Sequence, residues 1–370
     1  MDSSLLNTLP QETLHQIFSH LPLRHIAAAK CVCRALRSTL TSPPFLHLLR
    51  SHPDHPLPLL ALKPSHRHVP DQPTIHAFDP RSKRWLRFSL SFLPFSSLHP
   101  ITSANGLLYL WATAAPNPQT QNPPKALVVC NPLTGQFKTL PQLGSAWSRH
   151  GSVLAGSLNI VLVLTELAII YYSNDTNWLK FSSNLPSKPR SPILISDYIL
   201  TLCDVGSPWR SQWAMFKTKI VGMGKAMQWV RLEKQQWGDI FEVLRRPRLV
   251  KAGSESKVFM VGGLKSSYAL QSACSTIVIL RLDLESMEWE EAGRMPMEMY
   301  RCFVESSKFK VFGGGNRVCF SAKRIGKLAL WEEANGVDVK TEWMWVDGVP
   351  GNGDGLCRGF TFEARLDAMP

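Results

Sequence analysis

Residue types that could do chemistry occur in this sequence, but not at the spacing that catalytic sites use. Residues 222–226 read Gly-Met-Gly-Lys-Ala, which has some letters of a phosphate-binding loop. However, position 219 is Lys where that loop has Gly, and position 226 is Ala where it has Ser or Thr. The sequence contains no Gly-x-Ser-x-Gly turn and no His-Glu-x-x-His motif. We therefore expect no catalytic residue and no cofactor.

Possible metal ligands are equally poorly placed. Cys31 and Cys33 are separated by one residue instead of two, and no second pair completes a set of four ligands. Four histidines fall in the segment 51–73, which also holds six prolines: His52, His55, His66 and His68. Because prolines this dense favour an extended, solvated chain without a fixed scaffold, we predict no metal site.

Composition restricts the compartment and the partners. The 370 residues are 44% hydrophobic and 19% charged, which is typical of a globular protein. The net charge of +13 fits either a basic soluble surface or an acidic partner, and no aromatic-rich basic cluster indicates nucleic acid. The eight cysteines are scattered, as reduced cysteines are, and the first residues lack a secretory signal. We expect a protein of the cytoplasm and/or nucleus.

One apolar stretch, residues 152–173, is about long enough to cross a membrane. It contains Asn159 and Glu166, and it divides into two β-branched runs, 159–164 and 167–172. This pattern predicts two strands joined by a tight turn and no membrane span.

The first part of the chain is helical. Leu14, Ile17, Phe18 and Leu21 follow one face of a helix. A second helix is expected at 24–29, and a third contains Val32, Leu36 and Leu40 and ends at the two prolines 43 and 44. Three helices this short cannot bury a core alone, so their apolar surface needs a partner.

These residues resemble the F-box, a module that docks onto the Skp-type adaptor of cullin-based ubiquitin ligases. The resemblance covers residues 5–48 and includes the runs 9–23 and 31–38 and the pair Pro44-Phe45. It departs at Leu36, where many F-boxes have Trp, and at the small residues Ala27 and Ala28. The resemblance implies an adaptor-binding set, namely Leu9, Pro10, Ile17, Leu21, Pro22 and Val32.

A linker rich in proline and histidine is expected at 49–73, followed by repeats. Turns rich in Asn and Asp precede aromatic residues that recur at separations of 52, 41, 51, 60 and 54 residues: Trp85, Phe137, Trp178, Trp229, Trp289 and Trp343. Each unit is predicted to hold four short strands, because such turns let the last two strands pair tightly.

The repeats resemble kelch repeats, which form the blades of β-propellers. The best match is the double-glycine strand 258–263 with Trp289, and a second such strand is 310–315. We predict a mainly β fold: a kelch-type propeller of about six blades at 74–366, preceded by a three-helix F-box. Strand 359–366 should join 74–78 in one blade, and only the linker should connect F-box and propeller.

Together the two resemblances imply the substrate-recognition subunit of an SCF-type E3 ubiquitin ligase. It would catalyse nothing itself, and would hold a target protein near the ubiquitin-charged enzyme through the adaptor and a cullin. The alternative is a kelch scaffold that binds partners without degradation. Some kelch propellers are copper oxidases, but they are secreted and have a Tyr/Cys/His site that this sequence does not reproduce.

The target itself cannot be read from the sequence, but a binding face can. In four-stranded blades the loops between second and third strands lie on the same face as the connections between blades, and interface centres favour aromatic residues and arginine. A protein target, acidic if the net charge is informative, is therefore expected to contact the following candidates: Trp147, Arg149, His150, Trp209, Arg210, Tyr268, Arg294, Tyr300 and Arg301.

Overall fold

The structure is a computed structural model. It describes residues 9–52, 56–63, 73–114, 125–143, 151–156, 160–172, 177–220, 228–266, 274–304, 309–333, 342–350 and 356–370. Contacts divide the chain into two compact units. The first comprises residues 1–59, 71–140 and 362–370, and the second comprises residues 60–70 and 141–361.

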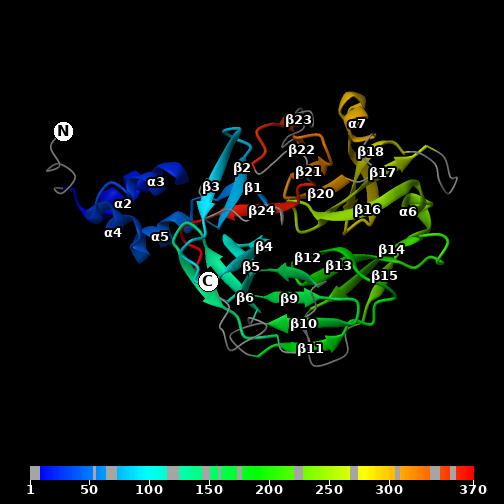
Figure 1. Ribbon diagram of the computed structural model, residues 1–370, viewed down its shortest axis with the longest axis horizontal. Coiled ribbons are helices and arrows are strands. Elements are labelled where there is room, and N and C mark those ends of the chain that lie inside the picture. Colours follow the sequence, from blue (N-terminus) through cyan, green and yellow to red (C-terminus); the bar gives the residue numbers. More distant parts are fainter. Residues whose placement is uncertain are drawn as a thin grey trace. The chain divides into compact units, whose positions relative to one another are not determined.

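Within the described residues the F-box region holds four helices, shown in blue in Figure 1: α2 (Gln11–Ser19), α3 (Leu23–Ala29), α4 (Arg34–Leu40) and α5 (Pro43–Arg50). The prediction of three helices is therefore wrong. Pro43 and Pro44 do not end the helical region but begin α5, because proline fits the first turn of a helix, where its missing N–H has no partner to lose.

A small core holds these helices together. Ile26, Leu40, Phe45 and Leu49 are buried, from α3, α4 and α5. The buried residues of α2 are His15 and Ser19. The predicted apolar face of α2, which includes Ile17, is therefore not the face that α2 packs into this core.

The strands form six four-stranded sheets, the blades of a six-bladed β-propeller, as predicted. In the first unit the second blade is built entirely from consecutive strands: β4 (Ser97–Ala104), β5 (Leu107–Thr113), β6 (Lys125–Asn131) and β7 (Gln136–Thr139).

The first blade combines both ends of the strand region. Its order is β24 (Gly359–Ala364), β1 (Leu57–Leu62), β2 (Thr74–Asp79) and β3 (Arg84–Ser89). The last strand thus shares a blade with residues 74–78, as expected, but β1 lies between them. β1 falls inside the segment predicted as a linker. Leu59–Leu62 are buried, and this apolar run outweighs the flanking prolines, of which Pro58 occupies only the start of the strand.

The second unit holds the other four blades. Their strands, in sheet order, are β8 (Ser152–Ala155), β9 (Val161–Leu164), β10 (Ala168–Tyr172) and β11 (Leu179–Ser182); β12 (Arg190–Ile195), β13 (Tyr198–Asp204), β14 (Trp213–Lys219) and β15 (Val230–Leu232); β16 (Leu244–Lys251), β17 (Lys257–Lys265), β18 (Cys274–Asp283) and β19 (Glu288–Arg294); and β20 (Phe309–Gly314), β21 (Arg317–Ala322), β22 (Leu328–Glu332) and β23 (Glu342–Val346).

The recurring aromatics mark the fourth strand of every blade. Trp85, Phe137, Trp289 and Trp343 lie in β3, β7, β19 and β23. Trp178 and Trp229 lie one residue before β11 and β15. The irregular spacing of 41 to 60 residues therefore still gave the correct number of blades.

The apolar stretch 152–173 contains β8, β9 and β10, and β9 pairs with β10 in the register Ile169 to Leu164. The prediction of two strands around a tight turn is confirmed. In the part of the chain that the structure describes, no helix is long and apolar enough to cross a bilayer.

In the second unit the first strands of successive blades lie against one another: β8 packs on β12, β12 on β16 and β16 on β20. Each of these strands begins where the connection from the preceding blade ends. We call the face of the second unit on which β8, β12, β16 and β20 begin the loop face. It carries the connections between blades and the loops between second and third strands.

Candidate functional site

Two surfaces could bind partners, and the first lies on the helices. The apolar residues predicted to bind an adaptor are accessible. Leu9, Ile17 and Val32 expose 39%, 50% and 73% of their surface, so all three belong to the exposed large apolar residues of the described chain. Pro10 and Pro22 are exposed N-caps of α2 and α3, and Leu21 is half-buried. Apolar side chains that the local core leaves outside are what a docking surface requires.

A polar contact fixes how α2 packs, so that this apolar surface stays outside. The His15 imidazole lies 3.1 Å from the Ser42 hydroxyl, which precedes α5. Its ring centroid is 5.6 Å from that of Phe45. α2 is therefore held through its His15 side, and Ile17 remains available.

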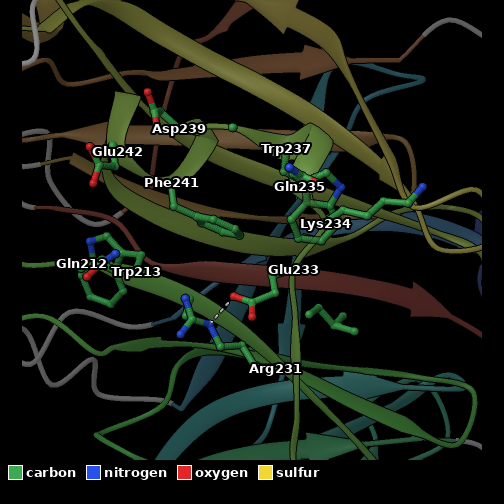
Figure 2. A pocket seen from close by; sticks show the side chains of 13 residues that line it. Gln212, Trp213, Arg231, Glu233, Lys234, Gln235, Trp237, Asp239, Phe241 and Glu242 are labelled. Atoms are coloured by element: carbon green, nitrogen blue, oxygen red, sulfur yellow. Dashed lines mark ion pairs between the residues drawn. The ribbon is translucent and has the colours of Figure 1, made fainter.

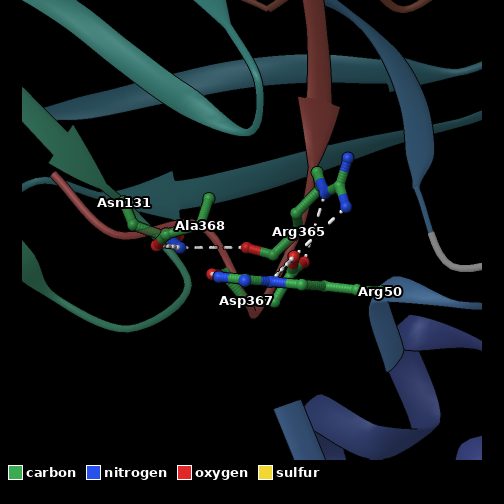
Figure 3. A network of polar contacts seen from close by, with 5 residues as sticks. All are labelled: Arg50, Asn131, Arg365, Asp367 and Ala368. Carbon is green, nitrogen blue, oxygen red and sulfur yellow. Dashed lines mark hydrogen bonds and ion pairs between the residues drawn. The ribbon is translucent and has the colours of Figure 1, made fainter. Parts of the chain in front are cut away.

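Within the first unit, the F-box helices contact the propeller part by more than the chain connection. Arg50, at the end of α5, donates from Nε to the Asp367 carboxylate at 3.2 Å and from Nη2 to the Asp367 carbonyl at 3.3 Å. Arg365 binds the same carboxylate, and Asn131 donates to the carbonyls of Arg365 and Ala368 (Figure 3). The expectation that only the linker joins F-box and propeller is wrong, because residue 367 lies far along the chain from Arg50 and no local pattern pairs them.

The second surface is the loop face. Trp209 and Arg210 lie in the loop between β13 and β14, as predicted. Trp209 exposes 93% of its surface, and Arg210 forms an ion pair of 3.1 Å with Glu242 of the next connection. The Asp204 carboxylate accepts hydrogen bonds from the amides of Gly206 and Gln212. Although burial raises it, these hydrogen bonds, with one from Ser211, hold the pKa of Asp204 below its usual value.

Three other predicted residues lie on or next to α7 (Met297–Val304). Arg294 ends β19 and pairs with Glu291 at 2.7 Å. Tyr300 is buried and its hydroxyl donates to the Cys274 carbonyl at 2.6 Å, so it holds α7 in place and offers no aromatic surface to a target. Arg301 is exposed, on the same helix face as the exposed Met297 and Val304. Trp147, Arg149, His150 and Tyr268 lie outside the described residues.

A pocket of about 470 Å³ opens between the start of β14, the end of β15 and the connection to β16. This connection contains the 3-10 helix η2 (Gln235–Trp237) and α6 (Ile240–Val243). Figure 2 shows Trp213, Trp237 and Phe241 among its lining residues, with Arg231 and Glu233 paired at 2.9 Å. This pocket was not predicted from the sequence, although two aromatics within the long connection 233–243 were a signal that could have indicated it.

Other chemistry is not assembled in the described residues. No three His, Cys, Asp or Glu side chains gather there as a metal site would require. None of the eight cysteines, all of which the structure describes, forms a disulfide bond. The segment 222–226 lies outside the described residues.

The comparisons agree with this division of the chain. The F-box domain family matches residues 6–48, which end within α5. The kelch motif family matches residues 245–296, which coincide with the blade β16–β19.

Two curated relatives from Arabidopsis thaliana match almost the whole chain. SKP1-interacting partner 15 is 56% identical over 385 aligned residues, covering 100% of both chains. Protein UNUSUAL FLORAL ORGANS is 22% identical, covering 96% of this chain and 81% of its own. Among solved structures, that of YjhT is 11% identical with a TM-score of 0.45, covering 73% of this chain and 91% of its own, which is too distant to support an argument.

Proposed function

Since this chain belongs to the family of F-box proteins with kelch repeats, we propose that it is the substrate-recognition subunit of an SCF-type E3 ubiquitin ligase. Its helices bind a Skp-type adaptor and, through it, a cullin. Its propeller binds the protein to be ubiquitinated. The subunit breaks and forms no bonds itself, and it acts in the cytoplasm and/or nucleus.

One observation carries this proposal: Leu9, Ile17 and Val32, in or next to the F-box helices, remain exposed, whereas the local core buries Ile26, Leu40, Phe45 and Leu49. The name of the 56% identical relative states that it interacts with SKP1, and the F-box match includes all three positions. A shared adaptor explains why this chain keeps apolar side chains in solvent, where they stabilise nothing until a partner covers them.

The test distinguishes adaptor binding by the helices from target binding by the propeller. Leu9 and Pro10 are changed together to Ala, and the adaptor and cullin are measured by co-precipitation. Targets are first identified by affinity purification with and without proteasome inhibition. We expect the double variant to lose adaptor and cullin. It should keep its targets, because neither Leu9 nor Pro10 takes part in the Arg50–Asp367 contact between the helices and the propeller.

The same variant should lengthen the half-life of the target in cells, because it holds the target away from the ligase. Normal adaptor binding by the variant would show that residues 5–48 are not a working F-box. Loss of adaptor with unchanged turnover of the target would instead leave the propeller as a scaffold that binds without degradation.

A further inference from the structure

Helix α7, in the connection from β19 to β20, is anchored to two blades of the second unit (Figure 1). The hydroxyl of its buried Tyr300 donates to the Cys274 carbonyl of β18 at 2.6 Å. The ring of its buried Phe303 stacks on the Trp345 ring of β23, with centroids 6.3 Å apart and an angle of 12° between the planes. Because both blades hold it, the helix has a fixed outer side.

The outer side of α7 is apolar around one arginine. Met297 and Val304 expose 55% and 59% of their surface, and Arg301 is exposed between them. Positions i, i+4 and i+7 of a helix share one face, so the three side chains lie in one row. Exposed apolar side chains that gather on one element, and that its own packing does not use, mark an interaction site.

Two cations lie beside α7 on the blade β16–β19. Arg245 pairs with Gly263, and a Cβ at Gly263 would lie 3.9 Å from the Arg245 Cβ and 2.7 Å from the Cys274 Sγ. Lys265 is the register partner of Cys274. Both cations therefore neighbour the residue whose carbonyl binds Tyr300 of α7. The pKa of Tyr300 agrees with this placement, because burial raises it and the charge of Arg245 opposes the rise.

Another cation lies beside α7 on the blade β20–β23. The Lys327 ammonium lies over the Trp345 ring, 4.2 Å from its centroid, and Phe303 of α7 stacks on the same ring. Lys327 ends the loop between β21 and β22, which belongs to the loop face, and Arg324 of this loop is exposed. Arg301 thus stands on a helix with basic side chains on both of the blades that hold it.

The protein leaves these charges without carboxylate partners. Four basic side chains around α7 have no carboxylate oxygen within 4.0 Å among the described residues: Arg245, Lys265, Arg301 and Lys327. Two other arginines of the loop face do have one, since Arg210 pairs with Glu242 and Arg294 with Glu291. The unpaired cations are therefore a property of the surroundings of α7 and not of the whole face.

Other charged groups near α7 do not supply the missing carboxylates. Glu298, in the first turn of α7, is exposed and forms no ion pair with Arg301 three positions later. Lys323 and Asp347 already have interaction partners and are left out of the balance. Four cations against the one carboxylate of Glu298 leave an excess of three positive charges, to which the exposed Arg324 adds.

The arrangement favours an acidic protein segment over other anions. The cations are distributed around a helix about 10–12 Å wide, which a single phosphate or carboxylate group cannot span. A nucleic acid would place its phosphates against the apolar Met297 and Val304. The Trp345 ring beside α7 is covered by Phe303 and Lys327, so it offers no surface on which a base could stack.

We propose that the outer side of α7 and the cations beside it bind an acidic segment of the target protein. Carboxylates of the segment face the four cations, and apolar side chains between those carboxylates cover Met297 and Val304. Complementary charge of this kind steers association and selects the partner, while the apolar contact adds affinity. The inference rests on the proposed function, since it names the class of target that the receptor recognises.

The test uses the full chain with its Skp-type adaptor on an array of synthetic peptides. Each peptide has about twelve residues, enough to cross α7 when extended, and contains Glu and Leu in equal number and random order. Every peptide is matched by one with Gln for Glu and one with Gly for Leu. We expect the best Glu/Leu peptides to bind about tenfold or more tightly than their Gln counterparts, and the Gly counterparts to bind more weakly too.

Three variants locate the binding. Arg301→Glu should weaken binding of the Glu/Leu peptides about fivefold or more, because it removes a cation and adds a repelling charge. Lys180→Glu makes the same change of net charge at an exposed position of β11 and should change binding by less than about twofold. Val304→Gln keeps every charge and should weaken the Glu/Leu peptides toward their Gly counterparts.

Several outcomes would overturn the proposal. Equal binding of Glu and Gln peptides would remove the acidic target, and equal losses for Arg301→Glu and Lys180→Glu would remove α7 as the site. Tighter binding of a single-stranded DNA oligonucleotide of equal charge would assign the face to nucleic acid instead. All three variants change exposed side chains and should melt with the wild type. Adaptor co-purification is scored separately: its loss counts against the F-box function, and the array still tests α7.

Discussion

Arg50 and Asp367, 317 positions apart in the chain, form an ion pair whose Nε–Oδ2 distance is 3.2 Å. The two partners differ in burial, because the side chain of Arg50 is 57% exposed and that of Asp367 only 10%. Asp367 also forms an ion pair with Arg365. The aspartate is therefore the centre of the contact, and Arg50 is the outermost of its partners.

This asymmetry predicts unequal losses of stability. Arg50→Ala should lower the free energy of unfolding by less than about 1 kcal/mol, as expected for an exposed pair. Asp367→Ala should lower it by about 2 kcal/mol, because two arginines lose a shared, nearly buried acceptor. Thermal and urea denaturation of both variants measures the difference, and equal losses would contradict it.

A pair of isoleucines separates binding from folding in the F-box region. Ile17 is half exposed and Ile26 is fully buried. Ile17→Ala should leave the melting temperature unchanged and weaken adaptor binding by roughly thirtyfold, a loss of about 2 kcal/mol. Ile26→Ala should instead destabilise the protein by about 2–4 kcal/mol through the cavity it leaves. Titration calorimetry with the adaptor and thermal melts of both variants distinguish these outcomes, and a stability loss at Ile17 would contradict its role as a binding residue.

Gly106 packs closely against residues 365–368, the C-terminal segment that contains Asp367. It has φ +83°, and a Cβ at this position would lie 2.8 Å from the Ala368 Cβ and 2.9 Å from the Arg365 Cβ. Gly106→Ala should therefore cost about 2–4 kcal/mol, from backbone strain and overpacking together. Gly315, at φ +68° with no atom within 4 Å of such a Cβ, is the control and should cost about 1–2 kcal/mol, from backbone strain alone. Equal melting temperatures for the two variants would show that residues 365–368 do not pack here.

Lys63 gives the protein a pH dependence of known sign. Its ammonium lies 5.6 Å from the Phe360 ring centroid, and burial, with a smaller effect of Arg358, lowers its pKa to about 8. An unfolded lysine titrates near pH 10.4, so between about pH 8 and 10 unfolding takes up a proton. Stability from this group therefore rises with pH, by at most about 1.4 kcal/mol per unit.

Lys63→Met removes that dependence. The free energy of unfolding of the wild type, relative to the variant, should increase between pH 8 and 10. Lys180→Met, at an exposed position of β11, controls for the loss of one charge. Parallel profiles for the wild type and Lys63→Met would contradict the lowered pKa.

The fold was predictable where local patterns repeat. Trp289 follows an Asp-containing turn and Gly262-Gly263 lie in a strand paired with β18, so turn chemistry and periodicity alone indicated that blade. The exposed F-box residues were predictable because the resemblance covers them residue by residue. β1 was not, since Pro56 and Pro58 indicate an extended connection, and only pairing with β24 and β2 makes 57–62 a strand.

The candidate target site was harder to predict. The exposure of Trp209 could be predicted from its place in a loop between two strands. The burial of Tyr300 could not, because it depends on how α7 packs. The pocket beside Trp213 was missed because its lining residues in β14, β15 and the connection to β16 meet only through tertiary packing. Contacts between blades leave no local signal in the sequence.

The order of the first blade affects how this protein is made. Because β24 completes the sheet that β1, β2 and β3 begin, that sheet is incomplete until residue 364 has left the ribosome. The helices within residues 9–50 pack on one another and are synthesised first. Under the proposed function, an adaptor could therefore reach a nascent chain before a target could, and a chain truncated before residue 359 would occupy adaptor with an unfinished propeller.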